Sequence, residues 1–85
     1  MNLAAQQHMI GTIKFAMMCV CERAGIYIRD PLDVVTRFDA GSKKLEMFVP
    51  ELKDIDRSIV EAIESKVRAS VPCGIEFSIV VAGAP

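Results

Sequence analysis

The chain has 85 residues and a formal net charge of −1, with 52% hydrophobic and 25% charged residues. These values exclude a second domain and a disordered chain, and they argue against a nucleic-acid partner. At this length, apolar burial at about 25 cal/mol/Å² and an ordering cost of about 1.5 kcal/mol per residue nearly cancel. We therefore expect association with a partner or a second copy to stabilise the fold.

The first 24 residues predict one nearly uncharged helix. Lys14 is the only Lys, Arg, Asp or Glu before Glu22, and Gly25 after Ala24 is a typical C-terminal stop signal. Apolar side chains point to nearly every side of such a helix, so we expect a core, partners or lipid to surround it. The residues that we expect to form an interface with a partner are Leu3, Met9, Ile10, Ile13, Met17, Met18 and Val20.

The same segment is a poor candidate for a membrane span. Lys14 divides its apolar run, and Gln6, Gln7 and His8 crowd its start. It has no Lys or Arg before residue 14, so the basic region of a signal peptide is missing. We expect no transmembrane helix, and attachment to a membrane surface stays an alternative.

Extended segments follow the helix. Residues 26–28 are a candidate strand that ends at Asp30-Pro31. Residues 34–38 and 44–49 alternate between apolar and other side chains, which predicts two half-buried strands. Residues 39–43 between them have the composition of a hairpin loop, in which Gly41 is available for a positive φ.

A second helix is predicted after Pro50, which can open a helical turn. Glu64 and Arg68 form an i,i+4 pair in the favourable orientation, and Pro72-Cys73-Gly74 ends the helix. The expected buried stripe consists of Leu52, Ile55, Ile59, Ala62, Ile63, Lys66 and Val67.

The clearest strand of the chain comes last. Its alternation predicts that Ile75, Phe77, Ile79 and Val81 face the helices. The predicted fold is therefore a single two-layer α+β domain over residues 1–85, in the order α-β-β-β-α-β. Its apolar N-terminal helix (1–24) precedes a small, mostly antiparallel sheet with the amphipathic helix (26–81).

No residue set in the sequence points to catalysis, a cofactor or a metal. His8 has no acidic neighbour to orient it, and Cys19 and Cys21 diverge by about 200° on a helix. Cys73 lies in a turn with Arg68 as the nearest cation in sequence, which is too little to activate a thiol. Three cysteines in this arrangement favour a reduced, intracellular setting over a disulfide scaffold.

The segment from residue 44 through the second helix to residue 80 resembles the C-terminal part of phage baseplate wedge proteins of the J-like type. The element that carries this resemblance is Pro72-x-Gly74, a turn between a helix and an outgoing strand. The resemblance implies a structural role in a phage tail or baseplate, without any catalytic residue.

Together these observations predict a non-enzymatic structural or assembly subunit that acts through its first helix. We expect a cytoplasmic protein, or a virion protein if the phage resemblance holds. The alternatives are a small ligand-binding or enzymatic α+β module and a protein attached to a membrane surface.

Overall fold

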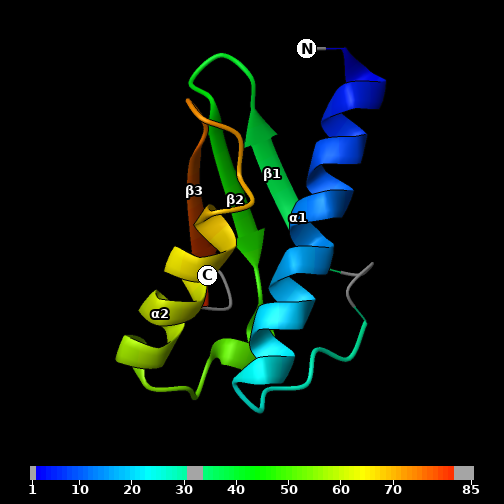
Figure 1. Ribbon diagram of the computed structural model, residues 1–85. Helices are drawn as coiled ribbons and strands as arrows, with labels where there is room; N and C mark the ends of the chain where they lie inside the picture. Colours follow the sequence, from blue (N-terminus) through cyan, green and yellow to red (C-terminus); the bar gives the residue numbers. More distant parts are fainter. Residues whose placement is uncertain (1, 31–33, 82–85) are drawn as a thin grey trace.

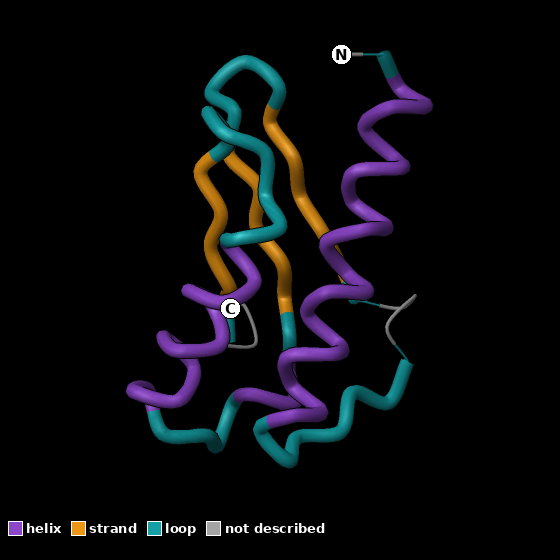
Figure 2. Tube along the Cα trace, viewed as in Figure 1, coloured by secondary structure: helices purple, strands orange, loops and turns teal. Residues whose placement is uncertain are grey.

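The computed structural model describes residues 2–30 and 34–81. Two helices lie on one face of a three-stranded mixed sheet (Figures 1 and 2), which confirms the predicted α+β class with two layers. The elements follow in the order α1 (Leu3–Arg23), β1 (Val35–Asp39), β2 (Lys44–Phe48), the short 3-10 helix η2 (Pro50–Leu52), α2 (Arg57–Arg68) and β3 (Glu76–Val80).

The sheet has the strand order β1-β2-β3. The hairpin connection makes the β1–β2 ladder antiparallel, with Val35 opposite Phe48 and Asp39 opposite Lys44. The β2–β3 ladder is parallel, because the chain crosses over through α2 before it forms β3. The sheet is therefore mixed, and both β1 and β3 are edge strands.

Helix α1 is capped at both ends, and its C-terminal cap is at the Gly25 that the sequence predicts. The Asn2 side chain accepts a hydrogen bond from Ala5 N at 2.7 Å. At the other end Gly25 has a φ of 80°, and its N–H donates to the carbonyl of Glu22. Ile26 N donates to the Cys21 carbonyl at 2.8 Å, which completes the hydrogen-bond pattern of a Schellman motif.

The candidate strand at residues 26–28 does not form. The Ile26 N–H donates to the Cys21 carbonyl at the end of α1, so it cannot also donate to a neighbouring strand. Ile28 is buried in the core while Tyr27 is 74% exposed. The segment thus covers the core as an irregular connection, and the sheet of the described residues has three strands.

The hairpin loop differs from the expectation in one detail. Lys43 takes the positive φ, at 56°, and Gly41 does not. The Asp39 side chain organises the loop instead, because its Oδ1 accepts from Gly41 N at 2.9 Å and from Ser42 N at 3.5 Å. A hydrogen bond from the Ser42 side chain, together with these two backbone hydrogen bonds, lowers the pKa of the Asp39 carboxyl.

Helix α2 begins later than Pro50 predicts. Residues 50–52 form the 3-10 turn, and α2 starts after Asp56, whose side chain accepts from Ser58 N at 3.1 Å. Val60, Ile63 and Val67 form the buried stripe of α2. Three residues that we expected in that stripe are exposed instead: Ile59, at 44%, Ala62 and Lys66.

The core lies between the two helices and one face of the sheet. Phe77 is 2% exposed, and Ile75, Ile79 and Val81 pack against the core as half-buried side chains, as predicted. The opposite sheet face carries no helix in Figure 1. The fully or nearly buried side chains are Met9, Ile13, Met17, Cys21, Ile28, Val34, Leu45, Met47, Val49, Leu52, Val60, Ile63, Val67 and Phe77.

Candidate protein interface

The structure divides the seven predicted interface residues into two groups. Met9, Ile13 and Met17 are buried in the core of the chain itself. Their predicted role as contacts to a partner is therefore replaced by packing within the chain. The residues of this set that keep accessible surface are Leu3, Ile10, Met18 and Val20.

The outward side of α1 carries two large exposed apolar side chains among the exposed polar residues Gln7, His8 and Thr12. Leu3 is 68% exposed and Phe15 is 61% exposed, while Met18 is half-buried. At 100° per residue, Met18 and Phe15 flank Gly11, which lies one turn before Phe15. A Cβ atom at Gly11 would meet no atom within 4 Å. We call Leu3, Gly11, Phe15 and Met18 the outer surface of α1.

Phe15 is the member of this surface that the sequence analysis missed. A helix with apolar residues on all sides gives no polar face from which to infer its orientation. The available signal was the position of Phe15 opposite the Met9, Ile13 and Met17 stripe, given that α1 buries only one stripe. Once that stripe is known to be buried, the exposure of Phe15 follows from helical geometry.

A second surface without a cover is the face of the sheet that points away from the helices. Val35, Phe48 and Val80 lie opposite one another across the three strands, and Val35 is exposed. The guanidinium of Arg37 lies 5.8 Å from the centre of the Phe48 ring. This cation–π contact covers part of the apolar row with a charged group.

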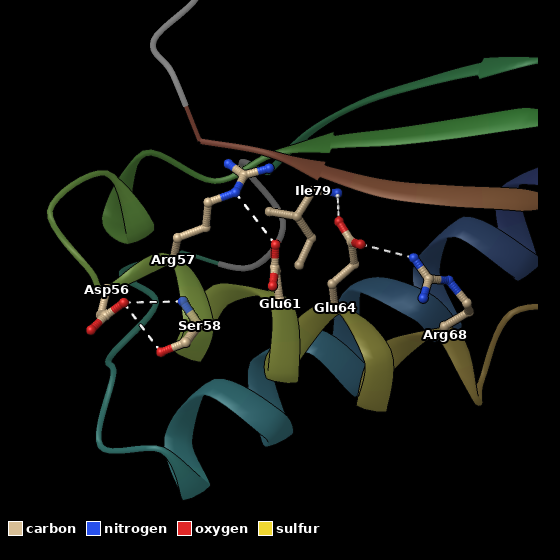
Figure 3. Close-up of polar contacts among 7 residues, drawn as sticks. All are labelled: Asp56, Arg57, Ser58, Glu61, Glu64, Arg68 and Ile79. Carbon is tan, nitrogen blue, oxygen red and sulfur yellow. Dashed lines mark hydrogen bonds and ion pairs between the residues drawn. The ribbon is translucent and has the colours of Figure 1, made fainter.

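The predicted pair of Glu64 and Arg68 is present, and it does more than bridge one helical turn (Figure 3). Arg68 Nη2 lies 2.8 Å from Glu64 Oε1 and also donates to the carbonyl of Phe77 at 3.2 Å. Glu64 Oε2 accepts from Ile79 N at 2.9 Å. Two side chains of α2 therefore bind the backbone of β3 along its outer edge.

Two of the three cysteines lie at least partly inside the fold. Cys21 is buried, and burial together with the nearby Glu51 charge raises its pKa to about 11. Its thiol is therefore protonated and inert near neutral pH. Cys19 is half-buried and Cys73 is exposed. Within residues 2–30 and 34–81, no group of three or more His, Cys, Asp or Glu side chains could hold a metal ion.

Comparisons with family models, curated proteins and solved structures find no match to this chain. The resemblance to phage baseplate wedge proteins therefore stays a prediction. Neither described helix has the combination of length and hydrophobicity that crossing a bilayer requires. This agrees with the expectation for the first helix, which Lys14 interrupts.

Proposed function

We propose that this protein is a non-enzymatic assembly subunit that binds a protein partner or further copies of itself through the outer surface of α1. The observation that supports this most strongly is Phe15, an aromatic side chain that is 61% exposed in the middle of a long helix. Large aromatic side chains contribute most to binding when a partner removes them from water.

Gly11 adds a second argument. Glycine inside a helix destabilises it by about 0.5–1 kcal/mol relative to alanine. Within the part of the chain that the structure describes, nothing requires glycine there, because the position of its absent Cβ is open space. A partner that approaches the helix closely beside Phe15 would account for the missing side chain.

The charge pattern of α1 supports the same surface. Between Asn2 and Val20 the only charged side chain is Lys14, which is half-buried. A solvent-facing helix normally carries several charges on its outer side. The near absence of charge on α1 favours a surface that is covered in the assembled state. Assignment of that assembly to a phage tail rests on the sequence resemblance alone and is part of the proposal.

The test is the replacement Phe15→Glu. Phe15 makes few contacts within the chain, so we expect the variant to keep the circular dichroism and melting temperature of the parent. Sedimentation velocity over micromolar concentrations should show the parent as assemblies and the variant shifted toward smaller species. A matched control is Tyr27→Glu, which places the same acid at an aromatic position that is 74% exposed outside α1.

Two results would contradict the proposal. One is a well-folded parent that stays monomeric at all concentrations and retains no partner from its natural context. The other is a parent that assembles with equal strength after Phe15→Glu and Tyr27→Glu. A catalytic activity that survives Phe15→Glu would favour the alternative of a small enzymatic or ligand-binding module.

A further inference from the structure

The two edges of the sheet are treated differently by the rest of the chain. On β3, Glu76 N donates to the Lys43 carbonyl and the Val80 carbonyl accepts from Val49 N, so these two residues face the chain of β2. Phe77 and Ile79 alternate with them and therefore direct their backbone groups away from β2. The outward Ile79 N–H donates to Glu64 (Figure 3), and the outward Phe77 carbonyl accepts from Arg68. A strand from another chain cannot pair with β3 without displacing these side chains.

The edge at β1 has no such cover. Successive residues of a strand direct their backbone N–H and C=O groups to opposite sides. Val49 N donates toward β3, so Glu46, three residues earlier, directs its backbone groups toward β1, where its register partner is Arg37. Thr36 and Phe38, which alternate with Arg37, therefore direct their N–H and C=O groups outward. Among residues 2–30 and 34–81, no backbone–backbone hydrogen bond to these outward groups is present.

Helix α1 packs mainly against α2, and Gln6 in its first turns lines a shared hollow with Phe38 and Ala40 at the hairpin end of β1. Phe38, close to that end, is only half-buried against the core. An added strand would cover the part of Phe38 that remains accessible and would extend the sheet beneath α1.

Charge selects the partner and the register. Two copies of β1 can pair antiparallel about a two-fold axis at Thr36, Arg37 or Phe38. An axis at Arg37 places two like charges opposite each other, and an axis at Thr36 places Arg37 opposite Val35. An axis at Phe38 places Arg37 of each copy opposite Asp39 of the other copy, so opposite charges meet twice.

We propose that β1 pairs antiparallel with β1 of a second copy of this chain, with Phe38 on the two-fold axis. The two Phe38 residues then exchange both backbone hydrogen bonds, and their side chains meet on the helix side of the joined sheet. Arg37 and Asp39 lie on the other face, where both are exposed. The result is a continuous six-stranded sheet whose outer edges are the two β3 strands, each bound by Glu64 and Arg68.

Neither member of the charge pair has to abandon its present contacts. Arg37 contacts Phe48 through a cation–π interaction, with its guanidinium 5.8 Å from the ring centre, and a guanidinium carries five N–H donors in all. Asp39 uses Oδ1 for the loop amides of Gly41 and Ser42, and a carboxylate offers about four acceptor positions.

A charge exchange tests both the surface and the register. Each of Arg37→Glu and Asp39→Lys brings two like charges together in the homodimer, so the Kd should weaken at least about tenfold in each. In an equimolar mixture, the Arg37→Glu chain meets the Asp39→Lys chain, and both contacts again join opposite charges. Sedimentation equilibrium of the mixture should therefore recover the dimer. All three samples carry Phe15→Glu as well, so that contacts through α1 do not contribute.

Arg57→Glu is the matched control, because it makes the same charge change on the exposed side of α2. It should leave the Kd unchanged.

Three results would overturn the pairing. The Phe15→Glu parent could be monomeric at all concentrations, the single charge variants could dimerise like that parent, or their mixture could fail to recover the dimer. Loss of larger assemblies through Phe15→Glu, with the β1 dimer retained, would support both proposals. An unchanged assembly after Phe15→Glu would contradict only the role of α1.

Discussion

Replacement of Glu64 by alanine tests the edge contact on which the asymmetry of the sheet depends. Glu64 lies on α2, its side chain is 23% exposed, and it accepts a hydrogen bond from Ile79 N at 2.9 Å. Loss of a hydrogen bond to a charged group costs about 1.5–3 kcal/mol, and loss of the helical ion pair with Arg68 costs about 0.3–0.5 kcal/mol. Water can reach this edge once the side chain is removed, so we expect a total near 2 kcal/mol.

The conservative variant Glu64→Gln separates the two contributions. Its amide oxygen can still accept from Ile79 N, while the ion pair with Arg68 is lost, so we expect a cost below about 1 kcal/mol. Urea unfolding at neutral pH measures both differences. A loss of about 2 kcal/mol corresponds to a decrease in Tm of roughly 8–16 °C for a domain of this size.

Amide hydrogen exchange gives a residue-specific measurement of the same contact. The Ile79 N–H should exchange faster in Glu64→Ala than in the parent, and Glu64→Gln should lie close to the parent. Equal urea midpoints together with an unchanged Ile79 exchange rate in Glu64→Ala would refute the reasoning. Opening this second edge should also allow β3 strands to pair, so Glu64→Ala should form species larger than the parent at high concentration.

Four further variants test the core and the helix. Phe77→Ala should lower the free energy of unfolding by about 3–5 kcal/mol, because it leaves a cavity at a side chain that is 2% exposed; a parent-like melting curve would contradict this. Gly11→Ala should raise the free energy of unfolding by about 0.5–1 kcal/mol in the Phe15→Glu background and weaken assembly in the parent. Replacement of Cys19, Cys21 and Cys73 together should preserve fold and assembly, and loss of an activity in a folded variant would contradict their dispensability. The raised pKa of Cys21 means that the unfolded chain releases its proton first, so stability should fall from pH 9.0 toward about 11, and less so in Cys21→Val.

Local signals in the sequence predicted the elements whose ends and faces are set by near neighbours. Gly25 ends α1 because glycine adopts a positive φ without a steric cost, and the hydrogen bonds of that cap are local. Leu45 and Met47 are buried because strict alternation fixes which strand face points to the core. The contact of Glu64 with Arg68 follows from i,i+4 spacing.

Tertiary packing decided the features that the sequence did not predict. The burial of Met9, Ile13 and Met17 instead of Phe15 depends on how α1 is rotated over the core, and an apolar helix does not encode that rotation locally. The later start of α2 depends on competition between Pro50 and Asp56, both of which are acceptable at a helix start. The bonds from Glu64 and Arg68 to β3 depend on a crossover that brings distant residues together.

The distribution of charge gives these features a common physical basis. Glu64 and Arg68 of α2 bind the outer edge of β3. Arg37 and Asp39 lie on β1, whose outer edge is free of such contacts among the described residues. Because a two-fold pairing of β1 uses the open edge of both copies, it leaves two edges that are already bound by side chains. Such an assembly stops at two chains along the sheet, and any larger assembly must then grow through another surface. The assembly that we propose through the outer surface of α1, where Phe15 is 61% exposed, would provide such a surface for growth.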